Sequence, residues 1–161
     1  MRRIALILCM MTAPKAATAD TIQDIVDGHI LPRFEALATQ TYALSDVAIM
    51  DCDPTSDALR SAYGDAFDAW ISASHLRFGP TEVDDRAYAL AFWPDSRGAT
   101  PRALNALLAD QDPIAASVET YGDVSIAARG FYAMEFLLYD ETLIAVGEQK
   151  FHCQLVQTIS A

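Results

Sequence analysis

Residues 128–140, ARGFYAMEFLLYD, place a few side chains capable of chemistry among apolar neighbours. Glu135 and Tyr132 could supply oxygen ligands to a metal ion, and Arg129 could pair with a carboxylate. Helical spacing would bring these three side chains to one side of a mostly apolar helix, where an unpaired charge is costly to bury. Two interpretations remain open. Arg129 and Glu135 form an ion pair that fixes helix register, or Glu135 is a ligand in a groove between helices.

Familiar catalytic patterns are missing from the rest of the sequence. His29, His75 and His152 stand far apart, and no H-E-x-x-H, G-x-S-x-G or phosphate-binding glycine loop occurs. His75 could be a metal ligand near the end of a helix, or a capping or core residue. The acidic positions do not follow the spacing of a calcium-binding loop.

The segments that would position these residues have helical periodicity. Apolar residues recur at steps of three and four from Ile22 to Ala48, and Pro32 should kink this helix or mark the start of its main part. A turn is predicted over residues 51–57. A second helix is predicted from about Ser56 to Leu76.

The C-terminal half of the chain continues the helical pattern. Residues 81–98 contain a proline and a glycine near their end and are predicted to be a loop-rich excursion. Further helices are predicted over residues 100–109, 123–139 and 151–160, and no segment shows β alternation. Several helices with short connections predict an all-α fold, an up-and-down helical bundle.

The first 19 residues resemble a signal peptide. Two arginines precede a short apolar run, and small residues follow it up to Ala19, after which cleavage is expected. Cys9 does not indicate a lipoprotein, because Leu8 stands where a small residue would be required. The apolar run is too short for a stable membrane span. The chain is therefore expected to be exported, with residues 20–161 as its folded domain.

The composition is strongly acidic. The formal net charge is −11, and removal of Arg2, Arg3 and Lys15 with the signal peptide would make it −14. Such a charge repels nucleic acid and anionic lipid and is compatible with cationic ligands. Cys52 and Cys153 remain after cleavage, and an even pair in an oxidising compartment predicts a disulfide.

Four stretches together resemble the imelysin-like family of bacterial envelope proteins. They are 29–46 HILPRFEALATQTYALSD, 67–80 FDAWISASHLRFGP, 92–98 FWPDSRG and 128–140 ARGFYAMEFLLYD. The resemblance implies an all-helical fold of two bundle-like halves, with this chain as the N-terminal half. The last stretch matches most specifically, and the sequence ends in a pattern that would continue a helix.

The resemblance also implies a site. The family's G-x-H-x-x-E motif falls on Gly130, Tyr132 and Glu135, so a tyrosine replaces the motif histidine. A phenol is a weaker metal ligand than imidazole at neutral pH, although tyrosinate binds ferric iron.

Three residues in the other family-like stretches could face the same groove. They are Arg77, Trp93 and Arg97. Their alternatives are a helix-end contact for Arg77, a core anchor for Trp93 and a loop salt bridge for Arg97.

The resemblance implies three alternative functions. The first is a periplasmic protein that binds iron, another divalent metal or a metal-linked ligand at Glu135 and Tyr132, with envelope metal-uptake proteins as partners. The second is an imelysin-type metallopeptidase, for which the motif histidine is missing. The third is a non-catalytic interaction module with a degenerate site. Nucleic acid is not expected as a partner.

Overall fold

The computed structural model describes the backbone of residues 18–161 and the side chains from Asp20 onward. The expected signal peptide lies outside the described residues, apart from the backbone of its last two positions. Every regular element in the described part of the chain is helical, which confirms the all-α prediction. Within that part, no helix combines the length and apolar character needed to cross a membrane.

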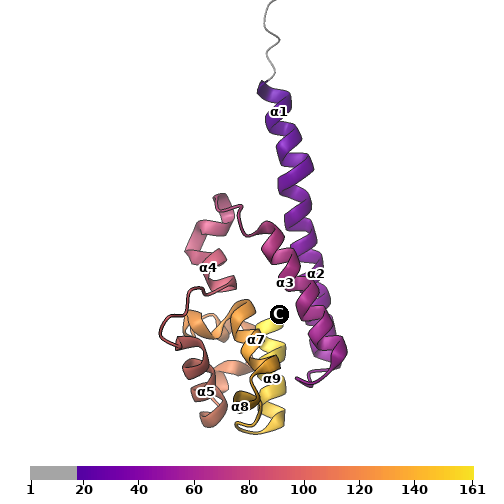
Figure 1. Ribbon diagram of the computed structural model, residues 1–161. Coiled ribbons are helices and arrows are strands. Elements are labelled where there is room, and N and C mark those ends of the chain that lie inside the picture. Colours follow the sequence, from indigo (N-terminus) through magenta and orange to yellow (C-terminus); the bar gives the residue numbers. More distant parts are fainter. Residues whose placement is uncertain (1–17) are drawn as a thin grey trace, which may run out of the picture.

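A long N-terminal rod is the most extended part of the molecule (Figure 1). It consists of α1 (Thr18–Ile25), the π-helical turn η1 (Val26–Ile30) and α2 (Leu31–Met50). Pro32 has no N–H to donate, and its ring would crowd the carbonyl group of Gly28 in a regular helix. The widened turn η1 lies at this point, so the chain passes the proline without ending the helix.

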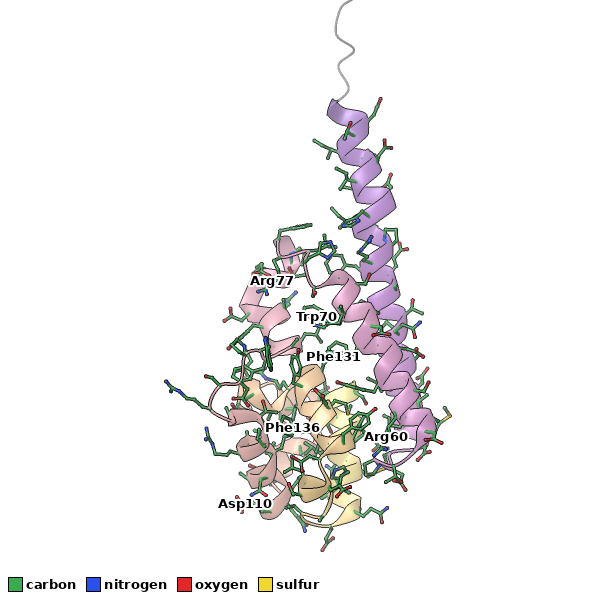
Figure 2. All side chains as sticks on the ribbon, in the orientation of Figure 1. Arg60, Trp70, Arg77, Asp110, Phe131 and Phe136 are labelled. Carbon is green, nitrogen blue, oxygen red and sulfur yellow. A yellow bond between two sulfur atoms is a disulfide. The ribbon has the colours of Figure 1, made fainter. Side chains whose placement is uncertain are left out.

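Helix α3 (Asp57–Ala73) packs along α2 and begins where the sequence predicted. The hydroxyl of Ser56 accepts a hydrogen bond from the Leu59 N–H at 3.3 Å, which caps the helix. The buried face of α3 includes Tyr63 and Trp70. Trp70 stacks on Phe131 with ring centroids 6.4 Å apart, so the α2–α3 pair is joined to the rest of the core (Figure 2).

The predicted excursion after α3 is confirmed as a break between the long helices, although more of it is helical than predicted. It contains η2 (Gly79–Asp85) and the short helix α4 (Arg86–Leu90), followed by a loop to Gly98. Helix α5 (Ala99–Asp110) then begins at the carboxylate of Asp95, which accepts hydrogen bonds from Ala99 N–H at 2.7 Å and Thr100 N–H at 2.8 Å. These bonds lower the pKa of Asp95.

The C-terminal part contains short elements that were not predicted, and one predicted helix begins later than expected. They are η3 (Pro113–Ala116), α6 (Val118–Tyr121), η4 (Ile126–Ala128), α7 (Gly130–Tyr139), α8 (Glu141–Ile144) and α9 (Gln149–Ser160). The helix predicted over 123–139 therefore begins only at Gly130. Its φ of +71° is incompatible with a helix that continues from the preceding residues, and Arg129 is extended. The hydroxyl of Tyr121 donates to the Ala128 carbonyl at 2.7 Å and holds this turn.

A disulfide links the end of α2 to α9. Cys52, just after α2, is bonded to Cys153 in α9, and their Cα atoms are 5.1 Å apart. The predicted pair is thus confirmed. Gln157 reinforces the joint, because its Nε2 donates to the Ala48 carbonyl of α2 at 3.2 Å.

His152 is buried in α9, and we expect acid to destabilise the protein through this residue. Burial lowers the pKa of His152 below its ordinary 6.5, against the opposing effects of a hydrogen bond to Leu137 and the charge of Asp53. The unfolded chain then binds this proton more readily than the folded one. The stability contributed by the neutral ring is full above about pH 6.5 and is lost as the pH falls through the lowered folded-state pKa.

Urea unfolding measured from about pH 7.5 to about pH 5 tests this expectation, because carboxylates contribute mainly at lower pH. The unfolding midpoint should fall across this window, and His152→Gln should remove part of the decrease. His29, whose pKa is also lowered, would account for the remainder. A pH dependence unchanged by His152→Gln would contradict the assignment.

Candidate functional site

An open pocket of about 660 Å³ lies over one side of α7. Its lining residues are Phe67 of α3, Trp93 of the loop after α4, Asp140 after α7, and Tyr132, Glu135, Phe136 and Tyr139 of α7 itself. Tyr132 precedes Glu135 by three residues and Tyr139 follows it by four, which is why helical spacing groups them. The pocket thus combines two carboxylates, two phenols and three further aromatic rings.

Glu135 is exposed to solvent at this pocket. The expectation that this side of the helix is mostly buried is wrong for Glu135, which shares the open pocket with Trp93 and with Phe67 of α3. Among the described residues, Glu135 has no ion pair and no hydrogen bond, and Arg129 is not its partner. Its carboxylate is therefore available to a ligand.

Tyr132 is half-buried between two aromatic side chains. Its ring centroid lies 5.9 Å from that of Phe67 in an edge-on arrangement and 5.6 Å from that of Trp93. Trp93 itself is 66% exposed, so it is not the core anchor that the sequence allowed as an alternative. These contacts fix the position of the phenol ring while leaving the pocket open.

Arg60 of α3 lies against Tyr139, one of the residues that line the pocket. Its guanidinium lies 4.8 Å from the ring centroid of Tyr139 and donates to the carbonyl groups of Pro54 at 2.8 Å and Leu138 at 2.7 Å. Burial, reinforced by the charge of Glu135, raises the pKa of the neighbouring Tyr63. The buried Tyr63 hydroxyl donates a hydrogen bond to the Phe131 carbonyl at 3.3 Å, so this residue belongs to the core.

Asp140 has a structural task that limits its use as a ligand. Its Oδ1 accepts hydrogen bonds from the Thr142 N–H at 2.8 Å and from the Thr142 hydroxyl, and so caps α8. The hydrogen bond from the Thr142 hydroxyl is the main cause of the lowered pKa of Asp140. Only the second oxygen of this carboxylate remains for the pocket.

Arg129 and Gly130 lie away from the pocket. Arg129 immediately precedes α7, and its Nη1 donates to the Gly122 carbonyl at 2.8 Å. Gly130 packs against the end of α4, where a Cβ atom would stand 2.2 Å from the Leu90 carbonyl oxygen. The motif glycine therefore allows the start of α7 to pack closely against α4.

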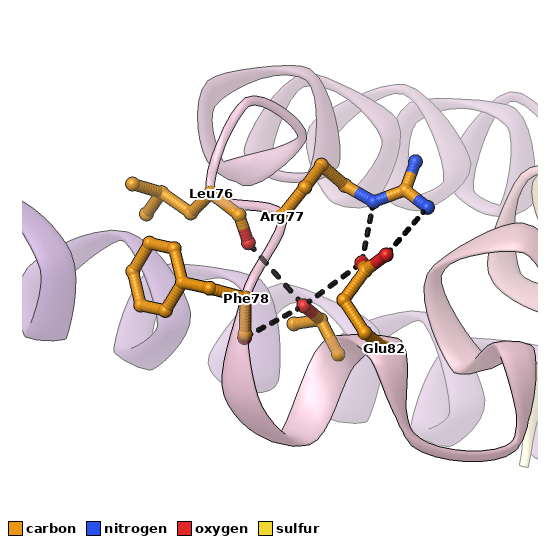
Figure 3. A network of polar contacts seen from close by, with 5 residues as sticks. Leu76, Arg77, Phe78 and Glu82 are labelled. Carbon is orange, nitrogen blue, oxygen red and sulfur yellow. Dashed lines mark hydrogen bonds and ion pairs between the residues drawn. The ribbon is translucent and has the colours of Figure 1, made fainter.

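The remaining residues predicted at the groove are also elsewhere. Arg77 forms an ion pair with Glu82, with Nε 2.6 Å from Oε1, in a network that includes the hydroxyl of Thr81 (Figure 3). Arg97 is exposed, and its carbonyl accepts a hydrogen bond from Arg102. His75 lies in the turn after α3. Of the residues predicted at the groove, the structure brings together only Tyr132, Glu135 and Trp93.

Sequence reasoning missed four lining residues. Tyr139 and Phe136 could have been predicted from the sequence, because both fall on the same side of the helix as Glu135. Asp140 and Phe67 could not, since one follows the helix end and the other comes from α3. Such contacts between distant segments leave no periodicity in the sequence.

Fold and pocket define a class: an all-α bundle protein with an acidic and aromatic pocket along one helix. The chain belongs to the imelysin family, whose model (Imelysin, Peptidase M75) matches residues 30–161. An imelysin-like protein from Psychrobacter arcticum 273-4, solved as a crystal structure, has the same fold with a TM-score of 0.72 and 22% sequence identity. The match covers 88% of this chain and 44% of that protein, so the chain spans less than half of its relative's length. Among curated proteins, no match was found.

Proposed function

We propose that this chain is a cell-envelope protein that binds iron, as Fe³⁺ or within an iron-bearing ligand, at the pocket around Glu135. The observation that carries the proposal is the unpaired Glu135 carboxylate, which faces an open pocket with a phenol on either side along α7. Carboxylate and phenolate oxygens are hard ligands, and they suit a hard, highly charged cation.

The donor set favours iron over a zinc site of the peptidase type. Within the described residues, no group of three or more His, Cys, Asp or Glu side chains is placed to hold a metal ion. Glu135, Tyr132 and Tyr139 are the side chains that would hold ferric iron, with the second oxygen of Asp140 beside them. When bound, the metal would supply Lewis acidity, while the chain's own residues would position the ligand.

An envelope location is supported by the sequence. The first 19 residues have the charge, apolar run and small residues of a signal peptide, and Cys52 and Cys153 form a disulfide, which persists in oxidising compartments. We therefore infer a periplasmic protein whose partners are envelope proteins of metal uptake. The strong negative charge is compatible with capture of a cation.

Glu135→Gln should lower the affinity for Fe³⁺ by about 10- to 100-fold, since it removes the central charged ligand while keeping the side-chain shape. Titration of the mature chain with a soluble ferric chelate would measure the affinity. A tyrosinate-to-iron absorption band in the visible range would report phenolate ligation, and Tyr132→Phe should weaken that band.

Glu35→Gln is the matched control, because Glu35 is an exposed glutamate of α2 outside the pocket. Equal iron affinity in wild type, Glu135→Gln and Glu35→Gln would overturn the assignment. Failure of the wild type to bind iron, combined with a gain of metal affinity in Tyr132→His, would identify the chain as an interaction module with a degenerate site. Peptide hydrolysis abolished by a chelator would instead establish the peptidase.

A further inference from the structure

Two histidines far apart in the sequence meet at the surface of the fold. His29 lies in the π-helical turn η1 and His75 lies in the turn after α3, 46 positions later. Their Nε2 atoms are 2.9 Å apart, and their rings meet with centroids 5.1 Å apart at an interplanar angle of 65°. The sequence suggested isolated histidines, and the tertiary structure corrects this.

Local bonds hold the backbone at both histidines. Nη1 of Arg33 donates to the His29 carbonyl at 2.8 Å, one turn along the rod. The N–H of Arg77 bonds to the His75 carbonyl at 3.0 Å, and the side chain of Arg77 is itself tied to Glu82 (Figure 3). The two rings therefore come from anchored positions rather than from a free loop.

Two imidazole nitrogens at this separation can hold either one proton or one metal ion between them. Adjacent nitrogen ligands at about 2.0–2.1 Å from a metal ion lie roughly 3 Å apart at right angles and somewhat further apart in a tetrahedron. Imidazole is a good ligand for copper, nickel and zinc. We propose that His29 and His75 form a binding site for a divalent late transition-metal ion, separate from the Glu135 pocket.

The charged groups around the pair act in both directions on an incoming metal ion. Arg33 is the nearby cation that opposes an incoming metal ion, and the net charge of −11 for the whole chain acts in the other direction. Arg77 is neutralised by its partner Glu82.

The coordination shell also has room for further ligands. His75 is exposed, and the described residues offer no third His, Cys, Asp or Glu in a metal-binding group. Water or a small ligand would occupy the other positions. Ile30 and Phe78, each near one histidine in sequence, line a mainly apolar pocket of about 460 Å³.

Titration of the untagged mature chain with Cu²⁺ at neutral pH tests the proposal, because copper stands highest in the affinity order of divalent metals. Calorimetry should show a site of one ion per chain, and electron paramagnetic resonance should show nitrogen ligands. Mutation of a residue that only contacts a metal ligand typically lowers metal affinity by roughly 10- to 100-fold. We therefore expect His29→Gln or His75→Gln to lower the affinity at least about tenfold, and the double variant to remove the site.

Circular dichroism would establish that the variants fold, which is expected because neither ring is in the core. Glu135→Gln should leave the copper site unchanged, so failure of this proposal is distinguishable from failure of the iron proposal. Copper binding of equal strength in the His29→Gln/His75→Gln variant would overturn the proposal and indicate surface carboxylates as ligands. A wild-type spectrum without nitrogen ligands would overturn it too, and would leave the pair as a hydrogen bond that joins the rod to α3.

Discussion

Gly130→Ala should destabilise the protein by roughly 3–5 kcal/mol, a large part of the total stability of an ordinary domain. The residue has φ of +71°, and an added Cβ would stand 2.2 Å from the Leu90 carbonyl oxygen and 2.5 Å from that of Ala89. Both contacts are with backbone, so no side-chain rotation can relieve them. The N-terminus of α7 would have to move away from the end of α4.

Chemical unfolding of Gly130→Ala against wild type would measure this effect. Gly64→Ala is the matched control, because Gly64 lies inside α3 and a Cβ there meets nothing within 4 Å. That variant should be neutral or more stable by about 0.5–1 kcal/mol, since alanine is the better helix former. A similar loss for both variants would contradict the steric explanation.

Removal of the Cys52–Cys153 disulfide should have the second large effect. The bond joins residues 101 positions apart, and a loop of this length predicts about 4–5 kcal/mol from the restricted unfolded chain. The double variant Cys52→Ser/Cys153→Ser should therefore unfold at much lower urea concentration. The joint between the end of α2 and α9 should be the first part to open, with the Gln157 hydrogen bond to Ala48 left to hold it.

Reduction of the wild type should reproduce the loss, and a reductant should have no effect on the double variant. Hydrogen exchange would locate the weakened region at the end of α2 and in α9. Unchanged stability after complete reduction would show that packing between α2 and α9 alone holds the joint.

The Gly130 variant and the disulfide variant should affect the two proposed metal sites differently. Gly130 sets the position of α7, which carries Glu135 and Tyr132, so its substitution should disturb iron binding through geometry. The disulfide lies at the opposite end of α2 from the His29–His75 pair, and its loss should affect copper binding little. The two sites can therefore be examined separately.

Several features of this protein follow from its sequence alone. Apolar spacing of three and four identifies the helices, because only a helix brings such positions to one face. The start of α3 near Ser56 and the loop-rich segment over 81–98 follow from capping and helix-breaking residues. The disulfide follows from there being only two cysteines after the expected leader, and the family match from the Arg-Gly and Glu spacing in residues 128–140.

Other features were decided by the tertiary structure. The helix predicted over 123–139 is shortened because Gly130 must approach the α4 carbonyl groups closely, and periodicity carries no record of a positive φ. Glu135 is exposed rather than buried because its neighbours are set by the position of Trp93 and α3. His29 and His75 meet only because α2 and α3 pack side by side. Sequence spacing determines which residues share one helix face, whereas contacts between helices depend on packing across distant parts of the chain.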